Sequence, residues 1–159
     1  MGVVRPARVS DLPAIVDLWE SLMATHVPLD PQLYETEPHG ADSYRAWVRR
    51  HMDDRRGVVL VVESEAAVVG YILGAQGARS PVFSIRRVGM IFDLSVGAGN
   101  RRKGFGQLLV EAAKARFEEM GIRHLQVNYD PNNQGAAGFW QRQGFEILLC
   151  EAYADLAGS

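Results

Sequence analysis

Apolar residues along the chain recur in two periods, one typical of helices and one typical of strands. After a Ser-Asp pair at 10–11, which suits a helix N-cap, they fall at helical spacing from Leu12 to Met23. A second helical face runs from Phe105 to Met120 and stops at Gly121, a residue type favoured just after a helix. The pattern predicts, in order, a strand at 3–9, helices at 12–23 and 44–51, strands at 57–63, 67–75 and 88–96, a helix at 105–120, a strand at 124–129, a helix at 134–142 and a last strand beginning at Phe145.

This order predicts one mixed α/β domain over residues 1–159, with no repeat, linker or low-complexity tract. The hydrophobic fraction of 47% and charged fraction of 23% are those of a soluble globular protein. Neither a run of roughly 18 apolar residues nor a secretory signal is present, so we expect no membrane partner and a cytoplasmic location. The single cysteine, Cys150, suits a reducing compartment and is expected to be a buried strand residue.

Charge and histidine placement narrow the kinds of partner. The net charge of −2 gives no reason to expect nucleic acid binding, so any anion site must be local. The four histidines are scattered without metal-ligand spacing, and we therefore expect no metal site.

The most informative stretch is the basic, glycine-containing loop Arg101–Gly106, which follows a predicted strand and leads into a predicted helix. The first turn of a helix leaves N–H groups unpaired, and the helix dipole makes that end electropositive. Glycines let an anion approach the backbone, and three adjacent cations add attraction. A phosphate or pyrophosphate site is therefore expected, the alternative being a solvated glycine turn with no ligand.

Two better-known phosphate motifs do not fit this loop. Gly99 and Gly104 have P-loop spacing, but Phe-Gly follows where that motif needs Lys and then Ser or Thr. A dinucleotide fingerprint starting at Gly104 and Gly106 would need a third glycine at the position of Leu109.

The loop resembles the pyrophosphate motif of the GCN5-related N-acetyltransferase (GNAT) family, with Arg101, Gly104 and Gly106 in the pattern Arg-x-x-Gly-x-Gly. Upstream, residues 93–96 look like the fourth strand of that family. Downstream, residues 133–145 are similar to its Asn-x-x-Ala…Tyr-x-x-x-Gly-Phe signature. With Arg-Pro-Ala at 5–7 similar to a family N-terminus, the resemblance covers nearly the whole chain.

The resemblance implies a mixed, mostly antiparallel sheet splayed between strands four and five, with acetyl-CoA bound between them. It implies direct transfer of an acetyl group to a primary amine of a small molecule or peptide, and it allows a homodimer, since dimers are common among relatives. Asn133 could cap the following helix, contact the cofactor, or do both. The implied cofactor-binding residues are Leu94, Ser95, Val96, Arg101, Arg102, Lys103, Gly104, Phe105, Gly106, Asn133 and Ala136.

The general base is a point of departure from the family. Its frequent strand-four glutamate falls at Met90 or Phe92, and neither side chain can act as a base. Asp93 is the remaining carboxylate and our candidate catalytic residue. Strand alternation turns it away from Phe92 unless a bulge intervenes, so a purely structural hydrogen-bonding role stays open.

The general acid is a second departure, because the tyrosine common in the family falls at Trp140, whose indole cannot give up a proton. Tyr129 and Tyr153 are substitutes, although packing is the default role of each. We expect Glu35, Tyr129 and Trp140 beside the acceptor, with Glu37 and Asp42 as alternatives to Glu35. These departures leave open a catalytically weak acyl-CoA binding or sensing module, or a transferase that uses another acyl-CoA.

Overall fold

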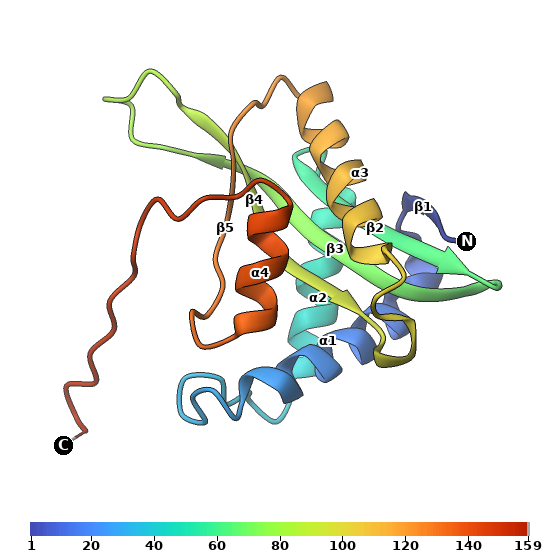
Figure 1. Cartoon of the computed structure of the whole chain (residues 1–159), viewed down its shortest axis with the longest axis horizontal. Helices are drawn as coiled ribbons and strands as arrows, with labels where there is room; N and C mark the ends of the chain where they lie inside the picture. The colour runs from blue at the N-terminus through green and yellow to red at the C-terminus, as the bar shows by residue number, and fades with distance from the viewer. Residues whose placement is uncertain (159) are drawn as a thin grey trace.

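A single five-stranded sheet runs through the protein, seen in a computed structural model that describes residues 1–158 (Figure 1). Its strands lie in the order of the sequence: β1 Val3–Pro6, β2 Gly57–Ser64, β3 Ala67–Ala78, β4 Arg87–Val96 and β5 Leu125–Val127. The first four pair antiparallel, and only β4 and β5 are parallel. The mixed, mostly antiparallel α/β fold that we predicted is therefore confirmed.

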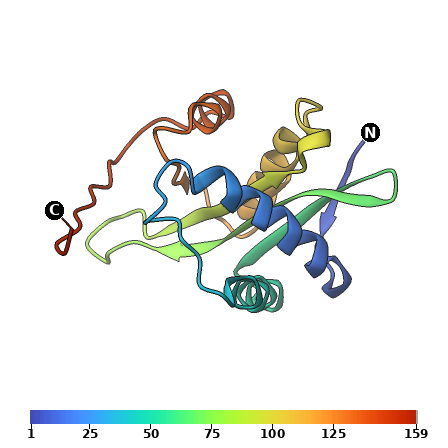
Figure 2. The same ribbon diagram turned by 90° about the horizontal axis from the view of Figure 1, so that it is seen from below.

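Helices cover both faces of this sheet. Helices α1 (Leu12–His26) and α2 (Gly40–Asp53) lie on one face, and α3 (Phe105–Glu119) and α4 (Gln134–Arg142) lie on the other (Figure 2). Short 3-10 turns, η1 (Val9–Asp11) and η2 (Ala98–Asn100), precede α1 and follow β4.

Strand β2 explains why the run of valine and leucine from 58 to 62 shows no polar alternation. Val58, Leu60 and Val62 pack into the core under α3, whereas Val59 and Val61 pack into the core under α1 and α2. Because successive side chains of a strand point to opposite faces, a strand covered on both sides must be apolar throughout. The two cores thus share one sheet.

Helix α1 begins where the Ser-Asp pair predicts, but the Asp11 side chain does not cap it and instead binds Arg5 and Arg8. Its carboxylate accepts hydrogen bonds from the Arg5 guanidinium at 2.8 Å and from the Arg8 backbone N–H at 2.7 Å. The bond to Arg5 is the main reason that the pKa of Asp11 lies below its ordinary value. This ion pair holds β1 against the first helical turn.

The predicted last strand is wrong, and so is the buried position of Cys150. Residues 145–158 form no strand, Cys150 is exposed, and the chain runs away from the body after α4 (Figure 1). The Phe145 N–H donates to the Trp140 carbonyl and Gly144 has a φ of 90°, an arrangement that closes a helix. Phe145 is thus used as a helix terminator, and β5 offers only three residues to a further strand.

Candidate functional site

A groove opens where β4 and β5 separate. The two strands pair only from Gly89–Leu125 to Ile91–Val127, while β4 stays paired with β3 as far as Val96. Beyond Ile91, the edge of β4 that faces β5 has no strand partner within residues 1–158. This confirms the predicted splay between the fourth and fifth strands.

A β-bulge sets the direction of the side chains at the opening. Leu73 lies opposite Asp93 but Gly74 lies opposite Ile91, so Phe92 is an extra residue in β4. Phe92 therefore packs on the α1–α2 side and Asp93 bonds to a side chain of α2 on that same side. The β-bulge thus interrupts strand alternation and puts two successive side chains on one face of the sheet.

The bulge also sets the direction of the backbone groups. The Gly97 N–H donates to the Val69 carbonyl of β3, which by alternation turns the N–H groups of Leu94 and Val96 toward the open edge. The Val96 carbonyl accepts a hydrogen bond from Arg101 Nε at 3.3 Å on that edge. Backbone donors and a guanidinium thus meet at one side of the groove.

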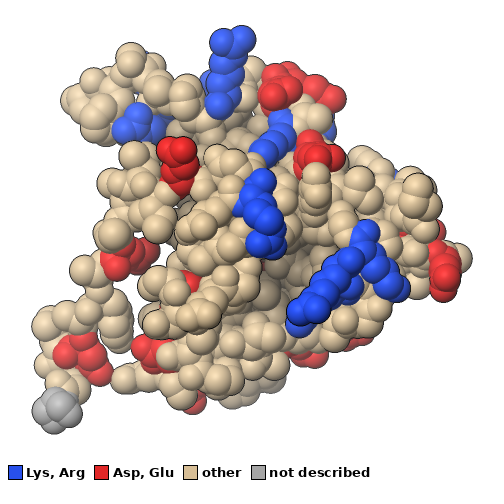
Figure 3. Space-filling model, viewed as in Figure 1, with Lys and Arg blue, Asp and Glu red and all other residues tan. Residues whose placement is uncertain are grey.

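The groove has a volume of about 670 Å³ and runs from α1 past β4 to the N-terminus of α3 and to α4. At the α3 end, Arg102 and Gly104 adopt left-handed φ values of 62° and 82°. A Cβ on Gly104 would meet no atom within 4 Å, so the backbone there is open to a ligand. In Figure 3, Lys and Arg side chains lie on the surface at the loop that leads into α3.

Most of the residues predicted to bind the cofactor line this groove. Lys103 does not; its Nζ lies 3.5 Å from the Asn100 side-chain oxygen on the exposed side of the loop. Those that do are Leu94, Ser95, Val96, Arg101, Arg102, Gly104, Phe105, Gly106, Asn133 and Ala136. Their contacts with a ligand stay a prediction.

Asn133 caps α4, one of the two roles left open for it. Its side-chain oxygen accepts the Ala136 N–H at 3.1 Å. The side-chain NH2 group keeps two donors on a residue that lines the groove. Capping therefore leaves its contact with the cofactor feasible.

The residues predicted beside the acceptor are not all brought together. Tyr129 and Trp140 line the groove, whereas Glu35 is exposed and does not line it. Trp140 is only 5% exposed, and its ring packs edge-on against Phe139 and Phe145. Its main place is the core under α3 and α4, so the position of the family tyrosine carries a packing residue.

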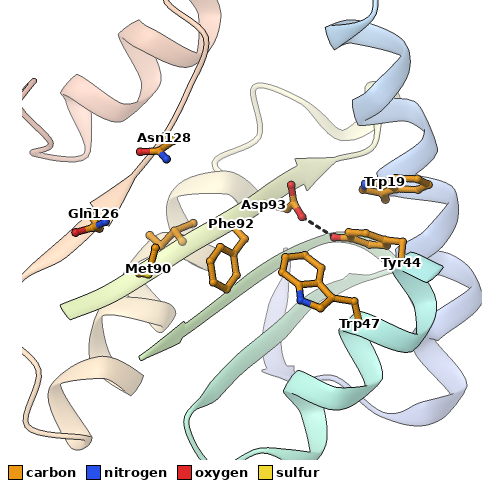
Figure 4. Close-up of a pocket in the computed structure, with 9 residues that line it drawn as sticks. Trp19, Tyr44, Trp47, Met90, Phe92, Asp93, Gln126 and Asn128 are labelled. Carbon is orange, nitrogen blue, oxygen red and sulfur yellow. Dashed lines mark hydrogen bonds between the residues drawn. The ribbon is translucent and has the colours of Figure 1, made fainter. Parts of the chain in front are cut away.

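Asp93 ends a chain of hydrogen bonds that sequence reasoning did not find. The Tyr44 hydroxyl donates to Asp93 Oδ2 at 2.8 Å (Figure 4), and the Tyr71 hydroxyl lies 2.8 Å from that of Tyr44. Since the single proton of Tyr44 goes to the carboxylate, Tyr71 donates to Tyr44. Burial raises the pKa of both tyrosines, which keeps them protonated as donors.

Burial also raises the pKa of Asp93 above its ordinary value, and the hydrogen bond from Tyr44 opposes that rise in part. A carboxylate with a raised pKa is a stronger base than a solvated one, as proton abstraction requires. His26, also on the groove, donates from Nδ1 to the Leu22 carbonyl at 2.8 Å, which fixes the orientation of its ring. Its position in the last turn of α1 was the only sequence signal for it.

The raised pKa of Asp93 predicts a dependence of stability on pH. As pH rises above about 4, the unfolded chain releases this proton before the folded chain does, so the free energy of unfolding falls until pH passes the folded pKa. Asp93→Asn cannot ionise and should lose this part of the fall. Urea denaturation of both proteins across the acid and neutral range measures it; parallel curves would contradict the prediction.

A second cavity, of about 310 Å³, joins the groove at Ile91, Phe92, Asp93 and Asn128. Trp19, Tyr44 and Trp47 form part of its wall. From the sequence, these three residues were expected only to lie within the helices predicted at 12–23 and 44–51. Their signal was the spacing of Tyr44 and Trp47, three apart on one helix face.

Other kinds of site receive no support from the part of the chain that the structure describes. Within it, no group of three or more His, Cys, Asp or Glu side chains is placed to hold a metal ion. None of the described helices is both long enough and apolar enough to cross a membrane.

Comparison with known proteins adds a family. The sequence profile of the acetyltransferase (GNAT) family matches residues 16–145. The chain is 24% identical over 146 residues to YhfO of Bacillus subtilis (strain 168), an uncharacterized N-acetyltransferase, covering 90% of this chain and 89% of that protein.

Solved structures are similar in fold. A tetramutant of the BH1408 protein from Bacillus halodurans superposes with a TM-score of 0.82 at 20% identity, covering 97% of this chain and 99% of that one. The aminoglycoside N-acetyltransferase AAC(6′)-Iy, solved in complex with CoA, gives a TM-score of 0.73 at 15% identity, with 98% and 94% covered. At these identities the likeness concerns the fold alone.

Proposed function

Because the chain belongs to the acetyltransferase (GNAT) family and is thereby an acyltransferase, we propose that it moves the acetyl group of acetyl-CoA directly to a primary amine of a small molecule or peptide. The observation that carries the proposal is the bulge at Phe92. It places a basic carboxylate, Asp93, within one residue of backbone donors on the open edge of β4. A base and an oxyanion site are the two groups that acyl transfer to an amine needs most.

The groove fits acetyl-CoA by the chemistry of its two ends. At the α3 end, the glycine loop, helix N-terminus, Arg101 and Arg102 suit a pyrophosphate. Along β4, the outward N–H groups of Leu94 and Val96 suit the amide-containing arm and the acetyl carbonyl. When bound, acetyl-CoA supplies an activated carbonyl carbon and a thiol leaving group.

Asp93 acts first in the proposed reaction. A primary ammonium with a pKa of about 10.4 is mostly protonated at neutral pH, so the carboxylate takes one proton from it. The freed nitrogen attacks the carbonyl carbon; the C–N bond forms, the C–S bond breaks, and the Leu94 N–H stabilises the oxygen on which charge develops. The nitrogen then loses its second proton to solvent, since Asp93 already holds the first.

The thiolate sulfur gains a proton from solvent or from Tyr129, because Trp140 cannot supply one. A thiol with a pKa of about 8.5 is only about 1.5 units above neutrality. Departure of the thiolate without a proton donor therefore costs roughly 2 kcal/mol at most. The lack of an acidic hydroxyl at Trp140 therefore slows the proposed reaction without preventing it. It also favours one alternative function, a catalytically weak acyl-CoA binding or sensing module.

Ligand-induced stabilisation tests cofactor binding. At a hundredfold excess over Kd, acetyl-CoA should add about 2.7 kcal/mol to the free energy of unfolding, which for a chain of this length raises Tm by roughly 5–11 °C.

Replacing Arg101 and Arg102 by alanine should weaken acetyl-CoA binding about tenfold, because two cations near the pyrophosphate are lost. Acetyl-pantetheine, which has no pyrophosphate, is the matched control and should bind both proteins equally.

Thiol release with a panel of amines then separates enzyme from sensor. Stabilisation by acetyl-CoA together with acetylation of an amine supports the transferase. Stabilisation with no acetylated amine supports the sensor, and no stabilisation at millimolar ligand removes both.

A further inference from the structure

The second cavity has walls made largely of aromatic rings. Trp19 of α1 stacks on Tyr44 of α2 with ring centroids 4.5 Å apart and an interplanar angle of 12°. Trp47 is tilted against both Tyr44 and Phe92, at 5.8 and 5.2 Å. Figure 4 shows these four rings around Asp93, with Gln126 and Asn128 across from them. The rings contact one another in series, so the wall is continuous.

The same cavity carries one charge. Among its described lining residues, Asp93 is the only Asp, Glu, Lys, Arg or His; the Tyr44 phenol stays protonated, and Gln126 and Asn128 are neutral amides. Aromatic ring faces attract a cation through their quadrupole, most strongly when water is excluded. A single carboxylate among such rings is matched by a single positive charge.

The position of this cavity relative to the groove is what gives it a role. Ile91, Phe92, Asp93 and Asn128 line both, so a ligand in the cavity reaches the open edge of β4 at Asp93. The rest of a molecule whose cationic group is held at Asp93 would lie against Trp19, Trp47 and Phe92, which line the cavity and are only partly buried.

We propose that this cavity is the acceptor site and that it selects a monoamine carried on a flat aromatic body, an arylalkylamine, over polyamines and aminoglycosides. The proposal rests on the transferase function above. The volume of about 310 Å³ lies at the lower end for small-molecule sites and suits one ring with a short amine arm. A polycation would bring a second ammonium group, for which the cavity lining offers no second carboxylate.

The neutral amides add a preference on the side of the site that lies across from the aromatic rings (Figure 4). Gln126 and Asn128 can each donate and accept hydrogen bonds. A ring that carries a hydroxyl group should therefore bind at least as well as an unsubstituted one. Tyramine and phenethylamine form the pair that tests this.

Kinetics with four amines tests the selection: phenethylamine, tyramine, butylamine and spermidine, each with acetyl-CoA. We expect kcat/KM for phenethylamine to exceed those for butylamine and spermidine by at least tenfold. Trp47→Leu should lower the value for phenethylamine about tenfold and that for butylamine less than threefold. Phe83→Ala, which changes an exposed aromatic outside both cavities, should alter neither. A preference for spermidine, or an equal loss for all amines in Trp47→Leu, overturns the proposal.

A binding measurement without acetyl-CoA keeps the pocket separate from the reaction. Phenethylamine should quench tryptophan fluorescence of the wild-type protein with at least tenfold higher affinity than the uncharged 2-phenylethanol, and Asp93→Asn should remove that difference. If no amine is acetylated but this pattern holds, the proposed function fails and the pocket stands. If phenethylamine binds no more tightly than butylamine, the pocket assignment fails whatever the enzyme does.

Discussion

Asp93→Asn should lower kcat/KM for the amine acceptor by about a hundredfold or more, since a positioned general base contributes roughly 10²–10⁴. Asparagine keeps the shape and can still accept the Tyr44 hydrogen bond, but it cannot take a proton. The rise in Tm on adding acetyl-CoA should be unchanged, because the groove contacts predicted for the cofactor lie on Leu94 and beyond. Thiol-release kinetics together with thermal denaturation measure both quantities.

Asp17→Asn is the matched control, since Asp17 is an exposed aspartate of α1 that lines neither cavity, and it should be neutral in both assays. Tyr44→Phe is the complementary variant. Losing its hydrogen bond should raise the pKa of Asp93 further and move the acid limb of the kcat/KM–pH profile to higher pH. Turnover by Asp93→Asn within threefold of wild type would clear Asp93 of the base role.

Hydrophobic period predicted most of the fold because it reports burial directly. Helix α4 has the predicted bounds, and α3 ends one residue before the expected end. The strand predicted at 3–9 stops at Pro6, where Arg8 and Asp11 close a 3-10 turn. The strand predicted from Phe145 failed at its start because the Phe145 N–H is used by the end of α4, a contact that the hydrophobic pattern does not encode.

The pyrophosphate end of the groove could be predicted from the sequence, whereas the second cavity could not. Binding of a pyrophosphate depends on a local loop, and residues 101–106 are contiguous in the sequence. The second cavity forms where α1, α2, β4 and β5 meet, so Trp19, Tyr44 and Gln126 come together only in the folded chain. The direction of Asp93 depends on a bulge, and one extra residue in a ladder leaves no mark in the sequence of the strand itself.

Phe117 packs beside the short β4–β5 pairing, so its side chain should affect both the stability of the protein and the shape of the groove. Its ring lies against Gly74 of β3 and Gly89 of β4, where a Cβ would come within 3.3 and 2.8 Å of ring carbons. Gly89 is also the first residue of the short parallel pairing with β5, opposite Leu125. Two glycines on adjacent strands thus make room for one ring over the junction from which the groove opens.

Phe117→Ala should therefore destabilise the protein by about 3–5 kcal/mol, as expected for truncating a fully buried phenylalanine, which is here 1% exposed. For a chain of this length, that lowers Tm by on the order of 10 °C. Because the β4–β5 pairing loses its cover, the acetyl-CoA-induced rise in Tm should also shrink. Calorimetry with and without acetyl-CoA measures both effects, with the exposed Phe83→Ala as the control of equal truncation. A loss below about 1 kcal/mol would show that the ring does not support the junction.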